Sequence, residues 1–97
     1  MRTCYLVCYD VADPKRLTRV RTTLRGFGAP LQFSVFLCYL TDQRRVQLHG
    51  ALLAIINTRE DRVLIANLGP LDGRGERTVE FIGAPPIQHP TVGPTIV

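Results

Sequence analysis

The hydrophobic pattern of the chain begins with an extended run and then changes to helical spacing. Residues 3–9 are apolar on both faces of a strand, which is typical of a strand covered on both sides. Asp13 and Pro14 follow as an acidic N-cap and a proline at the first helical position. They predict the start of a helix. Apolar residues then recur at spacings of three and four, as on one face of a helix, and glycines at 26 and 28 predict its end. The apolar stripe consists of Leu17, Val20, Leu24 and Phe27.

Residues 31–40 form a second extended run, rich in β-branched and aromatic side chains. Polar and apolar residues alternate as far as Ser34, and the rest of the run is apolar. We therefore expect one long strand that is bent or bulged near Ser34, or two strands in close succession. Thr41 or Asp42 can cap a second helix that reaches about Ile56. The buried stripe of this helix is predicted to be Leu48, Leu52, Ile55 and Ile56.

The last third of the chain reads as a turn, a strand and a hairpin. Residues 57–61 form a polar turn and residues 62–68 a strand. A glycine-rich turn at 69–75 then leads to a predicted hairpin partner at 78–82. After Gly83 four prolines rule out a regular helix or a central strand.

The order of these elements predicts the fold class. Strand, helix, strand, helix, strand, strand gives an α+β protein with two helices on one face of a largely antiparallel sheet. The ferredoxin-like βαββαβ sandwich, with an extra C-terminal strand or tail, is the natural candidate. We predict one domain over residues 1–83 and a Pro-rich tail over residues 84–97 that packs on a dimer partner.

Composition and charge narrow the class of protein. The chain has 97 residues, 45% of them hydrophobic, and a net charge of +4, and eleven of its twelve basic residues are arginine. Arginine binds phosphates bidentately, so this balance favours a nucleic-acid partner. No apolar run approaches the ~18 residues of a membrane span, and no signal peptide is evident. We expect a cytoplasmic protein without a membrane partner. Its cysteines, Cys4, Cys8 and Cys38, are expected to be buried, reduced thiols.

Asp10 is the candidate catalytic and metal-binding residue. It is the only one of the eight acidic residues placed at the edge of a buried element, although an aspartate there is also typical of a turn or a helix-dipole partner. Mg²⁺ requires several oxygen ligands, and one chain supplies one suitable carboxylate. Metal chemistry therefore predicts a homodimer in which two copies of Asp10 meet on the symmetry axis.

Other chemistries have weaker support in the sequence. Ser34 has no His and Asp partners for a serine hydrolase, and the glycine-rich residues 69–75 lack the lysine of a P-loop. The basic residues of the first helix are either a solvated face or phosphate contacts. Four aromatic residues could stack bases, but we expect them in the core or an interface. They are Tyr5, Tyr9, Phe33 and Tyr39.

Between about residues 3 and 70, the sequence resembles the CRISPR-associated protein 2 family, the small partner of the CRISPR integrase. The residues that carry the resemblance are 5–13, 15–16, 19–20, 24, 27–28, 32–36, 60–63 and 68–70. The resemblance implies a ferredoxin-like fold and a homodimer whose C-terminal segments cross onto the partner. It also implies that Asp10 of each protomer faces the other and holds Mg²⁺ or Mn²⁺.

The resemblance also assigns roles to other residues. Lys15, Arg16 and Arg19 match a basic helix start that faces nucleic acid. Leu17 departs from the family, because many relatives carry a basic or polar residue there. The second-strand motif near the dimer axis is matched by Tyr9, Ser34 and Phe36.

Two functions are implied by the family, and a third stays open on the same fold. The favoured function is a metal-dependent endonuclease that cleaves RNA or DNA and acts with the CRISPR integrase in spacer acquisition. The alternative is a non-catalytic scaffold that holds DNA for the integrase. The third is a stand-alone RNase of toxin type.

Overall fold

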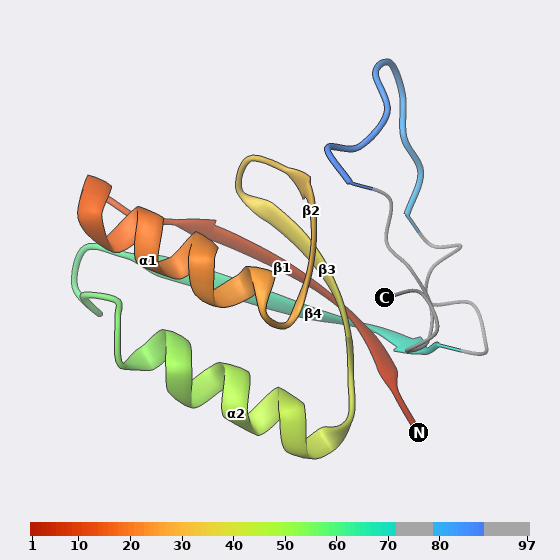
Figure 1. Ribbon diagram of the computed structural model, residues 1–97, viewed down its shortest axis with the longest axis horizontal. Helices are drawn as coiled ribbons and strands as arrows, with labels where there is room; N and C mark the ends of the chain where they lie inside the picture. Colours follow the sequence, from red (N-terminus) through yellow and green to blue (C-terminus); the bar gives the residue numbers. More distant parts are fainter. Residues whose placement is uncertain (72–78, 89–97) are drawn as a thin grey trace.

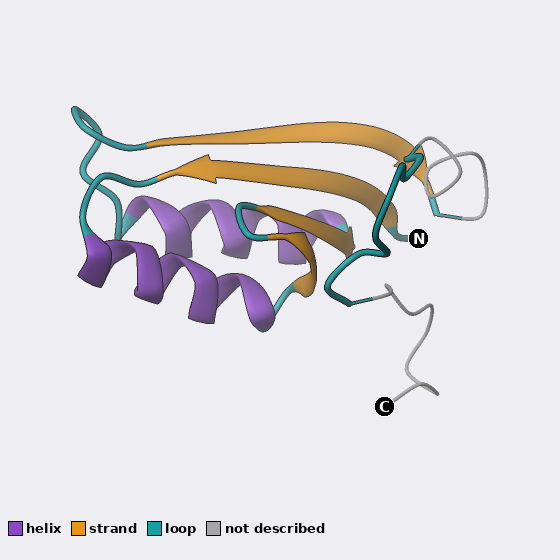
Figure 2. Cartoon of the chain, turned by 90° about the horizontal axis from the view of Figure 1, so that it is seen from above, coloured by secondary structure: helices purple, strands orange, loops and turns teal. Residues whose placement is uncertain are grey.

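The computed structural model describes residues 1–71 and 79–88. Four strands form one antiparallel sheet in the order β2-β3-β1-β4, and two helices cover one of its faces (Figures 1 and 2). This arrangement confirms the predicted ferredoxin-like α+β fold. The elements are β1 (Thr3–Asp10), α1 (Pro14–Arg25), β2 (Gly28–Gln32), β3 (Val35–Leu40), α2 (Asp42–Leu53) and β4 (Arg62–Pro70).

The main core lies between the sheet and the helices. In the centre of the sheet, Val7 on β1 pairs with Phe36 on β3 and Ile65 on β4. Val7 and Phe36 are fully buried, together with Val20 and Leu24 from α1. The other face of β1 packs into a smaller cluster centred on Cys4, Leu31 and Leu37. β1 is therefore the central strand that its two apolar faces predict.

Both helices begin at the predicted caps. The Asp13 carboxylate accepts a hydrogen bond from the Arg16 backbone N–H at 2.9 Å. The Thr41 hydroxyl accepts one from the Arg44 backbone N–H at 3.2 Å. The second helix was predicted to reach about Ile56, but it ends at Leu53. The helix ends in a tighter turn of 3₁₀ type, in which the Ile55 N–H donates to the carbonyl of Leu52, three residues earlier. Ile55 and Ile56 still pack against the core, partly buried.

The second extended run forms two strands, β2 and β3, joined by a turn at Phe33 and Ser34. This result decides between the two predicted arrangements. β2 starts earlier than expected, at Gly28, because the backbone there runs against β3. A Cβ on Gly28 would collide with the Leu37 carbonyl oxygen and the Cys38 side chain. β2 is an edge strand, where a proline such as Pro30 is tolerated.

The predicted hairpin partner of the last strand is wrong where the structure describes it. Residues 79–82 form no strand, and residue 78 lies outside the described residues. Val79 instead packs against the apolar cluster of β1, β2 and β3. The backbone N–H groups of Ile87 and Gln88 donate to the carbonyls of Leu31 and Pro30, at 2.9 and 3.0 Å. The segment thus meets the β2 side of the sheet rather than the outer edge of β4. Packing of residues 84–97 on a partner stays a prediction.

Two further observations concern the described residues. None of the helices in residues 1–71 and 79–88 is both long and apolar enough to cross a membrane. Cys4 and Cys38 are buried and Cys8 is half-buried, and no disulfide joins them. Burial raises the pKa of the Cys38 thiol to about 12 and also raises the pKa of Cys8. These thiols are therefore protonated at neutral pH, as expected for structural cysteines.

Candidate metal and nucleic-acid site

Asp10 is the last residue of β1, and its side chain points into solvent at the end of the sheet. The carboxylate is 74% exposed and forms an ion pair with Arg62 on β4, with Nη1 and Oδ2 3.4 Å apart. Asp10 and Arg62 are also backbone partners in the sheet. At this distance and exposure the pair is held weakly, because water competes for both groups. The Asp10 carboxylate is therefore available to a ligand.

The surface beside Asp10 is hollow and largely apolar. An open hollow of about 450 Å³ is lined by residues of β1 and β4, including Cys8, Asp10, Arg62 and Leu64. Leu64 is 58% exposed, although it is a large apolar residue. Cys8, Asp10, Arg62 and Leu64 are cross-strand neighbours on the sheet face that the helices leave open (Figure 2). A carboxylate thus stands at the end of an exposed apolar strip.

One chain offers few ligands for a metal at this place. Among residues 1–71 and 79–88, no three His, Cys, Asp or Glu side chains lie close enough together to hold a metal ion. Asp10 fits a Mg²⁺ or Mn²⁺ site by its chemistry, because both ions prefer carboxylate oxygens. The remaining ligands would have to come from a second copy, from water or from phosphates.

A second acid at the same end of the molecule behaves differently. The side chain of Asp61 is fully buried, and Arg16 donates to it from Nε at 2.7 Å and from Nη2 at 3.2 Å. The backbone N–H groups of Ala12 and Asn57 also donate to this carboxylate, at 2.9 and 2.8 Å. Arg16 reaches Glu60 as well, at 3.0 Å. We call the group of Arg16 and Asp61 the buried clasp.

The buried clasp fixes the segment that follows Asp10. Through Ala12 it ties the loop between β1 and α1 to the turn between α2 and β4. The hydrogen bonds from Arg16 hold the pKa of Asp61 well below its usual range, and that carboxylate in turn raises the pKa of Arg16. Sequence reasoning placed Asp61 in a polar turn and missed this role. The available signal was the position of Arg16 at the margin of the apolar stripe of its helix.

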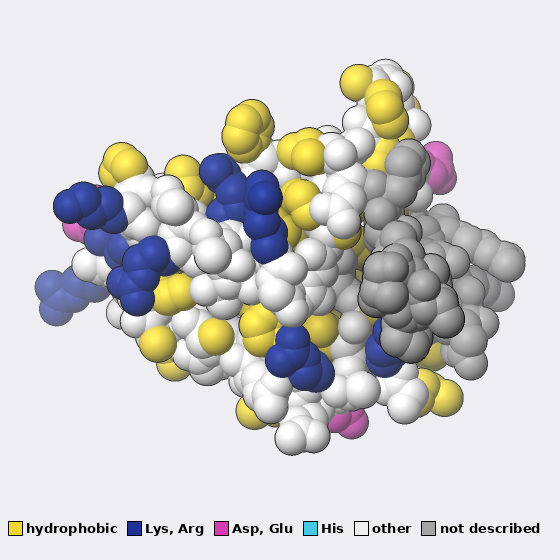
Figure 3. Space-filling view, in the orientation of Figure 1, with side chains coloured by type: hydrophobic (Ala, Val, Ile, Leu, Met, Phe, Trp, Pro, Cys, Tyr) yellow, Lys and Arg dark blue, Asp and Glu magenta, His cyan; other side chains and the backbone are white. Residues whose placement is uncertain are grey.

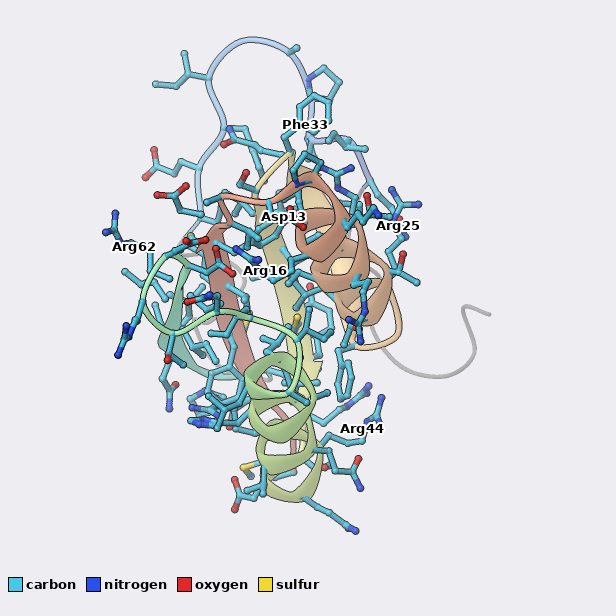
Figure 4. The ribbon with its side chains drawn as sticks, turned by 90° about the vertical axis from the view of Figure 1, so that its left-hand side faces the viewer. Asp13, Arg16, Arg25, Phe33, Arg44 and Arg62 are labelled. Atoms are coloured by element: carbon cyan, nitrogen blue, oxygen red, sulfur yellow. The ribbon has the colours of Figure 1, made fainter. Side chains whose placement is uncertain are left out.

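The predicted nucleic-acid residues therefore differ in their surroundings. Lys15 and Arg19 are exposed on α1, whereas Arg16 is 23% exposed and its guanidinium is occupied by Asp61. Lys and Arg side chains gather on and beside α1 in Figure 3. Figure 4 shows Arg16 directed into the molecule, while Arg25 and Arg62 project outward. The surface that can meet phosphates is thus the outer side of α1.

Tyr9, Ser34 and Phe36 are brought together at the turn between β2 and β3. The Tyr9 hydroxyl donates to the Phe33 carbonyl at 2.7 Å, and the Tyr9 N–H donates to the Ser34 carbonyl at 3.1 Å. Phe36 is fully buried, with its ring centroid 6.2 Å from that of Tyr9. Tyr9 and Phe36 are thus core residues that support the turn. Phe33, expected in the core or an interface, is 74% exposed and lies beside Arg21 in this chain.

The fold and these residues define a small ferredoxin-like protein with one exposed carboxylate at the end of its first strand and a basic first helix. The chain belongs to the family described as CRISPR associated protein Cas2, whose sequence model matches residues 2–71. It is 43% identical over 68 residues to the "CRISPR-associated endoribonuclease Cas2 1" of Rhodospirillum rubrum, covering 70% of this chain and 67% of that protein.

Two solved structures extend the likeness to the fold. Streptococcus pyogenes Cas2 at pH 6.5 is 33% identical and superposes with a TM-score of 0.73, covering 82% of this chain and 99% of that one. A chain of a partial Cas6-RT-Cas1–Cas2 complex is 28% identical with a TM-score of 0.69, covering 90% of this chain and 98% of that one.

Proposed function

We propose that this chain acts with the CRISPR integrase in spacer acquisition, and that its dimer is a metal-dependent endonuclease on RNA or DNA. The observation that supports the enzymatic part of this proposal is the exposure and weak pairing of the Asp10 carboxylate. This carboxylate is 74% exposed, and within residues 1–71 and 79–88 its only ion pair is the 3.4 Å contact to Arg62, so it is free to bind a cation. The name of the Rhodospirillum relative, an endoribonuclease, and the Cas1–Cas2 complex among the similar structures support the same reading.

A homodimer would complete the metal site. The exposed strip beside Asp10 contains Cys8 and Leu64 on the sheet face without helices, and an exposed apolar strip favours contact with another protein surface. A two-fold axis near the ends of the β1 strands would bring two Asp10 carboxylates together. Mg²⁺ or Mn²⁺ bound there would polarise a phosphodiester and lower the pKa of a bound water.

The protein's own residues would position the nucleic acid. Lys15 and Arg19 extend from the outer side of α1, where they can contact phosphates without giving up an internal ion pair. Arg16 would act indirectly, because the buried clasp holds the loop between Asp10 and α1. In this proposal Lys15 and Arg19 bind the strand, and Arg16 and Asp61 keep the helix start in place.

The enzymatic proposal is tested with purified protein on RNA and DNA, with Mg²⁺, with Mn²⁺ and with a chelator. Asp10→Asn should abolish the metal-dependent cleavage. Asp42→Asn is the matched control. Asp42 is exposed in the first turn of α2, so this substitution removes the same charge at a position away from Asp10. Cleavage that survives Asp10→Asn or chelation would contradict the proposed mechanism.

The second candidate function is a non-catalytic scaffold, and the exposed cations of α1 favour it. A scaffold needs phosphate contacts but no metal, so Asp10→Asn should then leave spacer acquisition intact. Lys15→Ala with Arg19→Ala should impair acquisition, and nucleic-acid affinity should fall with salt. Loss of acquisition in an Asp10→Asn protein that folds and dimerises would contradict pure scaffolding. A gene neighbourhood without an integrase and a repeat array would favour the toxin-type RNase.

A further inference from the structure

Phe33 is the most exposed aromatic residue in the described part of the chain. Its side chain is 74% exposed at the tip of the hairpin formed by β2 and β3. A single exposed apolar residue is common on protein surfaces, so exposure alone does not indicate a ligand. The case for a ligand at Phe33 depends on how the turn holds the ring and on the charges beside it.

The ring is presented by a fixed backbone. The carbonyls of Phe33 and Ser34 both accept hydrogen bonds from Tyr9, at 2.7 and 3.1 Å. Tyr9 itself is 5% exposed and belongs to the main core. The turn is thus attached to β1, an interior strand of the sheet, and a ligand that stacks on Phe33 would not have to order a loose loop.

Positive charge lies next to this ring. The guanidinium carbon of Arg21 is 5.4 Å from the centroid of the Phe33 ring, in cation–π range. Arg25 follows one turn later on the same side of α1 and is exposed. Figure 4 shows Phe33 and Arg25 on the same side of the molecule. Among the described residues, no carboxylate forms an ion pair with Arg21 or Arg25.

We propose that Phe33 and Arg21 form a stacking site for an unpaired base of a nucleic-acid strand, and that Arg25 contacts the adjacent phosphate. Every base has a π-face, so stacking on a phenyl ring tolerates any sequence. Bases in a regular duplex are already stacked, so this site selects single-stranded ends or loops. The inference deepens the proposed function and depends on it, because it assumes that α1 faces nucleic acid.

Charge argues against a second copy of the chain as the occupant. A two-fold contact centred on Phe33 would place the same patch on both subunits. Arg21 and Arg25 would then meet their own copies across the interface, and like charges there repel. A polyanion meets the same patch with attraction. The nucleic-acid strand is therefore the favoured occupant.

The test compares three fluorescent probes by anisotropy: a blunt duplex, the same duplex with an unpaired overhang, and the single strand. Phe33→Ala should weaken binding of the overhang and the single strand by about 5- to 150-fold, the loss typical of one stacked base. Binding of the blunt duplex should not change. Phe33→Tyr should bind like the wild type because it keeps the ring. Phe81→Ala is the matched control, since Phe81 is also an exposed phenylalanine, at 44%.

A second measurement reports stacking directly. A 2-aminopurine base in the overhang should lose fluorescence on binding the wild type and Phe33→Tyr, and should lose less on binding Phe33→Ala. Unchanged single-strand affinity in Phe33→Ala would overturn the inference and leave the proposed function standing. Equal weakening of all three probes with a smaller mass by light scattering would assign Phe33 to a protein contact. If the wild type binds no probe at low salt, both the inference and the proposed function are wrong.

Discussion

Two acid–arginine pairs lie near the same end of the sheet and differ in almost every physical respect. In the buried clasp, Arg16 and Asp61 are 2.7 Å apart, and the side chain of Asp61 is 0% exposed. In the open pair, Arg62 and Asp10 are 3.4 Å apart, and their side chains are 81% and 74% exposed. Asp61 and Arg62 are consecutive residues, but they serve different pairs.

The difference in burial and hydrogen bonding between the two carboxylates indicates that Asp61 is the structural one. A buried carboxylate must have its hydrogen bonds satisfied, and Asp61 accepts them from Arg16 and two backbone N–H groups. Those bonds leave Asp61 no freedom to bind anything else. Asp10 keeps its hydration and can exchange water for a ligand. The distinction depends on what surrounds each acid, since both are aspartates with an arginine partner.

The largest effect on stability should come from Asp61→Asn. The substitution removes the charge from the buried clasp and leaves the guanidinium of Arg16 with only the exposed Glu60 as a described ion-pair partner, so the link between the two loops weakens. We expect the Tm to fall by more than about 5 °C, measured by circular dichroism. Glu60→Gln is the control, because Glu60 contacts the same arginine but its side chain is 59% exposed. An unchanged Tm in Asp61→Asn would contradict the structural role of the clasp.

The second-largest effect should be a loss of stability in acid, because protonation of Asp61 weakens the buried clasp. The pKa of Asp61 is lower in the folded protein than in the unfolded chain, where a carboxyl titrates near ~3.9. The unfolded state therefore binds the proton first, and the stability from Asp61 is present above that pH and is lost as the pH falls toward the folded pKa. We expect the Tm of the wild type to fall below about pH 4 and that of Asp61→Asn to fall less. Parallel curves for the two proteins would assign the acid sensitivity to other carboxylates.

Asp10→Asn should separate stability from function. The open pair is exposed, so its loss should change the free energy of unfolding by less than about 1 kcal/mol in a urea titration. If the proposed site binds Mn²⁺ in the folded dimer, the ion should raise the Tm of the wild type and should not raise that of Asp10→Asn. Asp42→Asn should respond to Mn²⁺ like the wild type. A shift that persists in Asp10→Asn would place the metal elsewhere.

The contrast between the pairs also explains what the sequence could predict. Asp10 was selected as the candidate site residue because it ends a strand that is apolar on both faces, which is a local pattern. The role of Asp61 was missed because its partners Arg16 and Ala12 lie 45 and 49 residues away. The helix start at Asp13 was also predicted from a local pattern, namely an acidic N-cap followed by Pro14.

The remaining errors also come from contacts distant in sequence. The strand break at Phe33 and Ser34 stayed open because Phe33 is not a turn former and a serine favours turns more weakly than Asn or Asp. Tyr9 on β1 supplies the hydrogen bonds that hold the turn. Residues 78–82 were predicted to pair with the last strand. Val79 instead packs against the apolar cluster on β1, β2 and β3. This contact depends on which apolar surface is available in the folded chain, and local sequence does not reveal it.

The smallest effect should come from Arg62→Gln, which removes the cation from the open pair. A positive charge about 4 Å from a carboxylate in water contributes about 1 kcal/mol, and it opposes the binding of a second cation to that carboxylate. We therefore expect Arg62→Gln to raise the affinity for Mn²⁺ by up to about 5-fold at low salt, measured by calorimetry, with the gain fading as salt screens the charge. Arg59→Gln is the control, because Arg59 is exposed in the neighbouring turn and has no carboxylate partner among the described residues. Weaker Mn²⁺ binding in Arg62→Gln would contradict this expectation. It would show instead that Arg62 helps the metal site by holding the Asp10 carboxylate in position.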